Sequence, residues 1–312
     1  MRVFTLLGCL MLVSGTIHGD SLPHGAPVIN EILATQVALD RNGFSPGEID
    51  GKAGRNLQRA ITAFQQSHQL PVTGRVDDQT WKELAASGDV PPLVEYAITD
   101  ADVAGPFTAD IPAKLPDQAA LDALNYRTPL EALAERFHSS PALLQHLNPG
   151  AMFQRAGERL MVPNVNSPSG ASSTTSNVTV VVTKSTSALT VEDPSGRILF
   201  HAPVTSGSVH DPLPIGEWKV NGVQRNPKFH YNPELFWDAT PSDRKATLQS
   251  GPNNPVGIVW IDLSKPHYGI HGTPEPSNIG HVESHGCVRL TNWDADRVAQ
   301  WVKAGTKVVF RE

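Results

Sequence analysis

The chain has 312 residues, of which 39% are hydrophobic, and its formal net charge is −6 at pH 7. That length is enough for two or three domains, each with its own core. The lysines and arginines form no basic run, which argues against nucleic acid and against an anionic membrane surface as partners.

The N-terminus has the layout of a secretory signal peptide, which we place at residues 1–19. Arg2 supplies the positive start, an apolar run extends to Val13, and small residues follow up to Gly19. The apolar run is shorter than the roughly 20 residues that span a bilayer. We therefore expect a periplasmic protein with no transmembrane segment after cleavage.

Residues 28–86 predict a compact three-helix bundle. Apolar residues recur at helical spacing over 29–37 and again over 57–64. A third, shorter helix carries Trp81 and begins after Asp77, which can cap it. Turns rich in glycine and proline separate the three helices.

This bundle resembles the peptidoglycan-binding domain found in many cell-wall enzymes. The matching residues are Asp50-Gly51, Gly54, Ala60-Ile61, Phe64-Gln65, Leu70-Pro71-Val72-Thr73-Gly74 and Thr80-Trp81. Leu57 departs from the family, which usually has a threonine at that place. The resemblance implies binding to peptidoglycan, and a structural spacer that no longer binds glycan is the alternative.

Residues 87–120 are rich in proline and in acidic residues, and we interpret them as an extended connector. Residues 121–165 then predict two amphipathic helices and a closing strand. The first helix includes Leu130 to Phe137, the second follows Pro141, and the strand begins at Leu160.

The segment 121–165 resembles a degenerate LysM unit, a small strand–helix–helix–strand fold that binds polymers of N-acetylglucosamine. The matching pieces are Leu147-Asn148-Pro149-Gly150 and Gly157-Glu158-Arg159-Leu160. The family's Gly-Asp-Thr turn is replaced by Arg127-Thr128-Pro129. A packing role is therefore as good an interpretation as glycan binding.

Residues 166–177 have the Ser-, Thr-, Pro- and Gly-rich composition of a flexible linker. Residues 178–311 consist mostly of short strands between turn signals. One prominent helix carries Trp293 and Trp301, and either Asn292 or Asp294 is placed to cap it. The chain thus predicts an α+β multidomain fold whose C-terminal domain is mostly antiparallel β.

Cys287 is the single thiol expected in the mature protein, because the only other cysteine, Cys9, lies in the predicted signal peptide. A lone thiol in an oxidising compartment is buried and inert, reactive, or bonded to another molecule. Cys287 stands in the string Ser284-His285-Gly286-Cys287-Val288-Arg289, sixteen residues after His271. These neighbours favour a nucleophile.

An imidazole beside the thiol would supply the chemistry that a nucleophile needs. An imidazolium lowers the pKa of a thiol, and the same ring can pass a proton to a leaving amine. Sequence spacing leaves both His271 and His285 as candidates. The amides of Gly286 and Cys287 are candidates for an oxyanion hole, and the Arg289 guanidinium suits a carboxylate.

The C-terminal residues closely resemble the active-site signature of YkuD-type L,D-transpeptidases, and the similarity extends over residues 178–311. The matching strings are Tyr268-Gly269-Ile270-His271-Gly272-Thr273, Ile279-Gly280 and Ser284-His285-Gly286-Cys287-Val288-Arg289-Leu290.

The resemblance implies that Cys287 is the nucleophile and His271 its acid/base partner, with the His271 ring oriented by a backbone carbonyl near Gly272. It also implies an orienting or oxyanion-binding role for Gly272, Gly286 and His285. Substrate binding would fall to Arg289, Tyr268 and Ser284.

This family implies acyl transfer in peptidoglycan without a cofactor. The thiolate attacks the bond between meso-diaminopimelate and D-Ala in a donor stem, D-Ala leaves, and a thioester forms. An amine of a second stem then gives a 3→3 cross-link, a lipoprotein lysine gives attachment to the wall, and water gives an L,D-carboxypeptidase. The sequence does not separate these acceptors.

Two other classes of function stay open. In a zinc peptidase, the histidine pairs 267/271 and 281/285 would bind metal and Glu283 would act as base. The glycines and prolines between these residues interrupt the helix that such spacing needs, so we expect no metal. The second alternative is a non-catalytic protein that only binds the wall.

Overall fold

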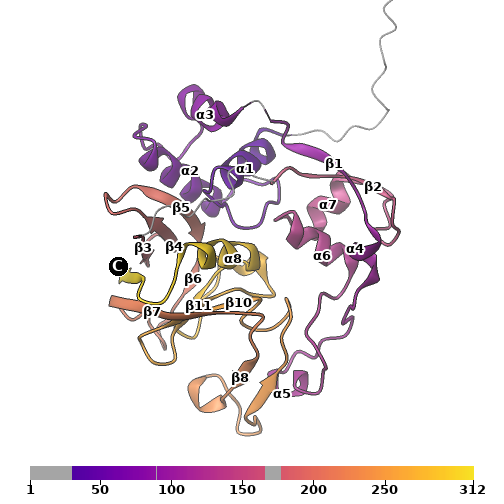
Figure 1. The fold of residues 1–312 in the computed structure, drawn as a ribbon, viewed down its shortest axis with the longest axis vertical. Coiled ribbons are helices and arrows are strands. Elements are labelled where there is room, and N and C mark those ends of the chain that lie inside the picture. Colours follow the sequence, from indigo (N-terminus) through magenta and orange to yellow (C-terminus); the bar gives the residue numbers. More distant parts are fainter. Residues whose placement is uncertain (1–29, 89, 166–176) are drawn as a thin grey trace, which may run out of the picture.

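The computed structural model describes residues 30–88, 90–165 and 177–312. The predicted signal peptide and nearly all of the predicted linker lie outside these residues. In the described part of the chain, no helix combines the length and the apolar character that a membrane crossing requires. The described residues form a helical N-terminal module (30–88), a middle unit (90–165) and a C-terminal β domain (177–312) (Figure 1).

The N-terminal module is the predicted three-helix bundle. Its elements are α1 (Glu31–Arg41), α2 (Arg55–Ser67), α3 (Asp78–Leu84) and the 3₁₀ turn η1 (Ala85–Ser87). The Asn30 side chain caps α1 by accepting from the Leu33 amide, and Asp77 caps α3 as expected by accepting from the Thr80 amide. The three helices enclose a core in which Phe64 is fully buried.

The middle unit begins earlier than the sequence indicated. Its elements are β1 (Leu93–Ala97), α4 (Asp100–Ala104), α5 (Leu115–Gln118), α6 (Pro129–Arg136), α7 (Pro141–Leu147) and β2 (Arg159–Pro163). We expected an extended connector over 87–120, but β1 lies in it and pairs antiparallel with β2, Leu93 opposite Pro163. A five-residue strand in a proline-rich segment gives little local signal, because it is stabilised by a partner 70 residues away.

The C-terminal domain is a mostly antiparallel sheet with one long helix, as predicted. Its elements are β3 (Thr179–Thr183), β4 (Ala188–Glu192), β5 (Ile198–Pro203), β6 (Thr205–Ser206), β7 (Gly216–Arg225), β8 (Phe229–Tyr231), η2 (Pro233–Leu235), β9 (Ala246–Leu248), β10 (Val259–Leu263), β11 (Gly269–His271), η3 (Pro276–Asn278), β12 (Val288–Arg289), α8 (Asn292–Trp301) and β13 (Lys307–Arg311). Nine strands form one sheet in the order β5-β4-β3-β13-β7-β10-β11-β12-β6. Its parallel pairs are β3–β13 and β11–β12.

Helix α8 packs its buried residues Ala295 and Val298 against this sheet. Its N-cap is Thr291, whose hydroxyl accepts from the Asp294 amide. The residues that we expected to cap it, Asn292 and Asp294, lie one and three positions further on. This shift leaves both of their side chains available for contacts with other parts of the chain.

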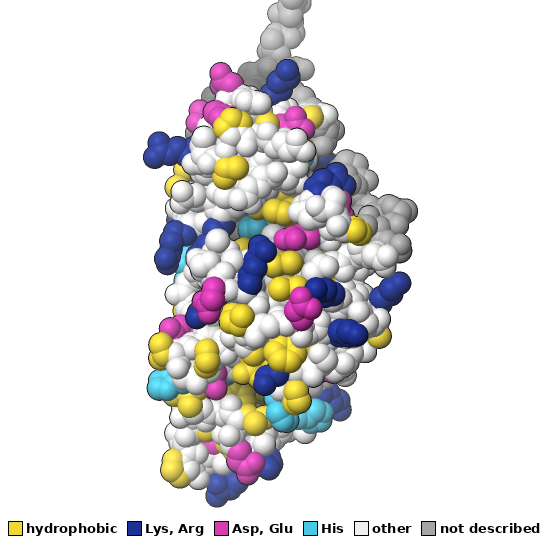
Figure 2. Space-filling model, turned by 90° about the vertical axis from the view of Figure 1, so that its left-hand side faces the viewer, with side chains coloured by type: hydrophobic (Ala, Val, Ile, Leu, Met, Phe, Trp, Pro, Cys, Tyr) yellow, Lys and Arg dark blue, Asp and Glu magenta, His cyan; other side chains and the backbone are white. Residues whose placement is uncertain are grey.

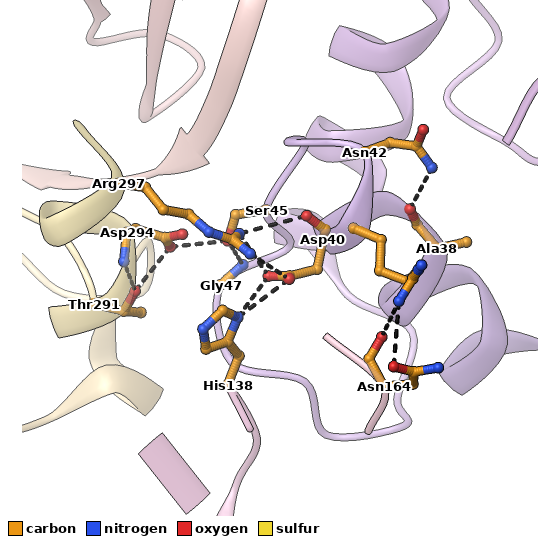
Figure 3. A network of polar contacts seen from close by, with 11 residues as sticks. Ala38, Asp40, Asn42, Ser45, Gly47, His138, Asn164, Thr291, Asp294 and Arg297 are labelled. Carbon is orange, nitrogen blue, oxygen red and sulfur yellow. Dashed lines mark hydrogen bonds and ion pairs between the residues drawn. The ribbon is translucent and has the colours of Figure 1, made fainter. Parts of the chain in front are cut away.

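A cluster of buried charges joins the three parts of the molecule (Figure 3). Asp40 of α1 receives two guanidinium contacts from Arg297 of α8, at 2.9 and 3.1 Å, and His138 of the middle unit lies 3.1 Å away. Burial alone would raise the pKa of Asp40, but Arg297 and His138 outweigh it and hold the pKa well below its usual range. Beside it, Ser45 donates to the buried Asp294 carboxylate at 2.8 Å.

The middle unit also supports the hairpin β8–β9 at the far end of the C-terminal domain (Figure 1). Leu124 is fully buried against Tyr231 and Leu248, and residues around α5 pack on the same cluster. The Leu124 amide donates to the Ser250 carbonyl at 3.0 Å. The end of the segment that we expected to be a connector, at Ile111 and Leu115, therefore packs against this hairpin.

The face shown in Figure 2 carries lysine and arginine side chains interspersed with aspartate and glutamate. Hydrophobic and histidine side chains lie between the charged ones. No charge of one sign dominates this face, which agrees with the lack of a basic run in the sequence.

Replacing Asp40 with asparagine should destabilise the protein strongly. The change removes the carboxylate with which the largely buried Arg297 forms its ion pair, and breaking such a pair costs about 3–5 kcal/mol of unfolding free energy. Urea denaturation measures this loss. The control is Glu95→Gln, which removes the partner of Arg159 in an ion pair whose side chains are 55% and 73% exposed. We expect about 0–1 kcal/mol there, and equal losses in both variants would contradict a structural role for the Asp40 cluster.

Candidate active site

Two short parallel strands bring the predicted catalytic residues together. Strands β11 and β12 pair with His271 opposite Arg289, and Cys287 directly precedes β12. Side chains alternate between the two faces of a strand, so residues two apart share a face. The register therefore places His271, Arg289 and Cys287 on one side of the sheet.

The Cys287 thiol is half-buried and donates to the His267 carbonyl, with Sγ 3.7 Å from the oxygen. Burial raises the pKa of this thiol. The Gly269 amide and the Arg289 charge act in the opposite direction, while Asp211 raises the pKa further. The thiol is therefore protonated at neutral pH.

His271 is buried, and its Nδ1 lies 2.7 Å from the Gly272 carbonyl oxygen. A carbonyl only accepts, so Nδ1 carries the proton and Nε2 is left as an acceptor. Burial, with a smaller contribution from Arg289, lowers the pKa of His271 to about 3. We expected an imidazolium that activates the thiol, but in this buried site beside a guanidinium the ring is neutral at pH 7.

The resting pair is thus a neutral thiol and a neutral imidazole. Among the described residues, the thiol has no hydrogen bond to His271 or to His285; its acceptor is the His267 carbonyl. A neutral imidazole with a free Nε2 can act as general base toward a thiol once substrate displaces that contact. Catalytic hydrogen bonds often form only when substrate is bound.

Ser284 shapes the turn that carries the nucleophile. Its buried hydroxyl donates to the Cys287 carbonyl and accepts from the Gly207 amide, both at 2.7 Å. We expected Ser284 to bind substrate, but these two contacts with the backbone occupy its hydroxyl. The geometry favours a role in fixing the turn instead.

The two glycines of the site have different roles. Gly286 has φ +98°, and a Cβ there would lie 2.8 Å from the Tyr268 ring, so only glycine fits. In the described part of the chain, the amides of Gly286 and Cys287 donate to no protein acceptor. They are available to an oxyanion. The Gly272 amide instead donates to Val259, which leaves Gly272 only its orienting carbonyl.

His285 points toward the hairpin. Its Nε2 lies within hydrogen-bond distance of an Asp238 carboxylate oxygen, at 2.8 Å, and its ring lies 4.9 Å from Phe236 and 5.6 Å from Trp237, measured between ring centroids. Trp237 in turn stacks on His210 at 4.4 Å. His285 therefore ties the loop after β8 to the turn of the nucleophile.

Arg289 and Tyr268 keep polar groups available to a ligand. Within residues 30–88, 90–165 and 177–312, the half-buried Arg289 guanidinium forms no hydrogen bond or ion pair. Burial lowers its pKa, and its charge interacts with those of Cys287, Glu275 and Asp238. Burial, with Asp211 and Cys287, raises the pKa of Tyr268, so its hydroxyl is a donor at neutral pH.

Sequence analysis missed Asp211. One of its carboxylate oxygens is buried without a hydrogen-bond partner, and its charge reaches both Cys287 and Tyr268. It follows His210 in a turn far from the signature strings, so no local motif marks it.

In each of the two histidine pairs that suggested zinc, the second histidine already contacts another group of the protein. His271 binds the Gly272 carbonyl and His285 binds Asp238. Across the described ranges, no group of three or more His, Cys, Asp and Glu side chains is arranged to hold a metal ion.

Comparison with known proteins identifies two regions. A family model described as "YkuD: L,D-transpeptidase catalytic domain" matches residues 177–310, and one described as "Putative peptidoglycan binding domain" matches residues 30–84. Neither model covers 121–165, so the LysM-like unit stays a prediction.

Two curated relatives match most of their own length. "Putative L,D-transpeptidase YkuD" of Bacillus licheniformis is 30% identical over 181 residues, which are 57% of this chain and 91% of the relative. Its Bacillus subtilis counterpart is 29% identical over 182 residues, 58% of this chain and 92% of the relative. Among solved structures, an L,D-transpeptidase from Mycobacterium smegmatis matches at 18% identity and a TM-score of 0.36, over 44% of this chain and 59% of that chain.

The alkylation rate of Cys287 by iodoacetamide should still rise with pH at about 8.5, the ordinary pKa of a thiol, because burial raises the pKa of this thiol. Arg289→Gln should slow alkylation at pH 8 several-fold, and Asp211→Asn should speed it, because their charges act on the thiolate with opposite signs. Cys287→Ser gives the background rate. A plateau already reached below pH 7 would contradict the neutral resting pair.

Proposed function

The chain belongs to the L,D-transpeptidase family, and from that premise we propose that it is a periplasmic enzyme that transfers acyl groups of peptidoglycan stem peptides through a thioester on Cys287. One observation carries the proposal. The β11–β12 register sets Cys287 on the same side as a neutral His271 whose Nδ1 is fixed to a backbone carbonyl and whose Nε2 is free.

In the first half-reaction the thiol proton moves to His271 Nε2 as sulfur attacks the carbonyl carbon between meso-diaminopimelate and D-Ala. The amides of Gly286 and Cys287 bind the oxygen, on which negative charge develops. His271 then passes the proton to the nitrogen of the leaving D-Ala. The C–N bond breaks, and the acyl group remains on sulfur as a thioester.

The two charged groups that act on the thiol with opposite signs suit a stem peptide. The unpaired Arg289 guanidinium suits a carboxylate of the donor stem, in the planar geometry that arginine offers. Asp211 brings a carboxylate of opposite charge to the site, which suits an ammonium group. A diaminopimelate side chain ends in both groups.

In the second half-reaction an amine attacks the thioester carbonyl carbon and gives its proton to His271; the C–S bond breaks, and His271 returns the proton to the leaving sulfur of Cys287. The amine of a second stem gives a 3→3 cross-link, and a lipoprotein lysine gives attachment to the wall. Water gives the L,D-carboxypeptidase, which is the alternative with the same site. The N-terminal module, as a peptidoglycan-binding domain, would hold the enzyme on its insoluble substrate and raise the local concentration of stems.

A disaccharide tetrapeptide incubated with the protein should yield tetrapeptide–tripeptide dimers, measured by mass spectrometry. Cys287→Ala should yield none, because the acyl group has no nucleophile to receive it. Tripeptide monomer as the sole product would replace the transpeptidase by the carboxypeptidase. An unchanged substrate in both samples, with no acyl adduct on the intact protein, would favour a non-catalytic wall-binding protein.

His271→Gln should reduce acylation of Cys287 by about 10³-fold, within the range that a general base contributes. His285→Gln is the matched control, since it removes the other nearby imidazole, which faces Asp238 and not the thiol. We expect it to reduce acylation less than about tenfold. Single-turnover formation of the acyl-enzyme measures both, and a larger loss in His285→Gln would transfer the role of base to His285.

A further inference from the structure

Asn292 packs against Gly272, the residue whose carbonyl orients His271. A Cβ on Gly272 or on Gly257 would overlap the Asn292 side-chain oxygen, so this oxygen fills the space between the two glycines. The same oxygen accepts from the Ile258 amide at 3.3 Å. Asn292 therefore holds the backbone at Gly272, whose carbonyl oxygen lies 2.7 Å from His271 Nδ1.

The side-chain nitrogen of Asn292 forms hydrogen bonds with the middle unit. Its Nδ2 donates to both carboxyl oxygens of Glu135 on α6, at 3.0 and 3.1 Å, and to the Pro252 carbonyl at 3.1 Å. The Tyr126 hydroxyl also donates to Glu135, at 3.2 Å. A continuous series of contacts thus connects Glu135 through Asn292 and Gly272 to His271.

Resting on the proposed function, we propose that Glu135 is a positioning residue of the active site, acting through Asn292 on the orientation of the His271 ring. The middle unit then completes the catalytic site in the same chain, whether or not it binds glycan. Neither residue touches substrate or the thiol in this arrangement.

Simple docking of the two domains does not account for Glu135. Docking is already provided by the Asp40 cluster, in which Arg297 of α8 binds Asp40 of α1 and not Glu135. An apolar side chain would fill a buried interface without the cost of burying a carboxyl group. A helix cap does not account for Asn292 either, because Thr291 caps α8.

The pKa of Glu135 is raised to about 8, mainly by burial. The hydrogen bonds from Asn292 and Tyr126 lower this pKa, and the charges of Glu131 and Glu48 raise it. The charge of Arg136 acts on the neighbouring Tyr126 and lowers the pKa of its hydroxyl. When folding raises the pKa of a carboxyl group, its protonated form stabilises the fold. This stabilisation is fully present at pH values below the ordinary pKa of the group and is lost as the pH rises from that value to the folded-state pKa, here about 8. Glu135→Gln mimics the protonated form, so it should remove this part of the pH dependence.

The test compares Glu135→Gln with Glu135→Leu in the full chain. Glu135→Gln keeps an acceptor for Asn292 and should keep acylation within about threefold of wild type while flattening the fall in melting temperature between pH 5 and 8. Glu135→Leu should reduce the maximal acylation rate about 10- to 100-fold, as expected when a catalytic group is displaced. Its KM for donor and its rate of alkylation by iodoacetamide should not change.

Asp102→Asn is the control for general damage to the middle unit. Asp102 is a buried carboxylate of the same unit, bound to Tyr96, Thr99 and Arg136 and not to the C-terminal domain. It should lower the melting temperature without changing the acylation rate of folded enzyme. Should Glu135→Leu fail to fold, Tyr126→Phe removes one contact to Glu135 and should reduce acylation several-fold.

A second readout separates this inference from the proposed function. The His271 Nδ1 proton should give a slowly exchanging imidazole NMR signal in wild type and in Glu135→Gln, and faster exchange in Glu135→Leu. Unchanged exchange and unchanged acylation in Glu135→Leu would overturn the positioning role. A wild-type protein that forms no acyl-enzyme would overturn the proposed function, while the NMR signal would still test the positioning of His271.

Discussion

The buried cluster of Asp40, His138 and Arg297 is the interaction on which the rest of the structure depends. It takes one side chain from each part of the molecule, so all three parts must dock together to pair its charges. Buried ion pairs add little net stability, because desolvation offsets most of the attraction, but an unpaired member is costly. We infer that the cluster selects one relative placement of the three parts, and this placement sets Glu135 of the middle unit against Asn292 of α8.

Burial governs the chemistry of the candidate site in the same way. It disfavours charge on both the thiol and the imidazole, so the two reacting groups are neutral at rest. Arg289 and Asp211 act on the thiol with opposite signs, and under the proposed function they would meet the charged ends of a stem peptide. The nucleophile would then be activated by the geometry of the bound complex, because proton transfer to His271 Nε2 needs the thiol to leave the His267 carbonyl.

Local sequence patterns were enough to predict the three-helix bundle, the mostly antiparallel C-terminal domain and the grouping of Cys287 with His271. Each of these depends on periodicity or on residues within one short signature. The strand at Leu93 could not be predicted in this way, because its partner lies at Pro163 and proline obscures its pattern. The contact of Glu135 with Asn292 joins residues 157 positions apart, and only the docking of domains creates it.

The last strand, β13, lies in the middle of the sheet, between β3 and β7. Without it the sheet divides into a three-stranded part at one edge and a larger part that carries the reacting residues. The domain therefore cannot close around its core until the C-terminal residues have been synthesised. Under the proposed periplasmic location, in which the chain would cross a membrane unfolded, the sheet that carries Cys287 would be completed only after residues 307–311 have crossed.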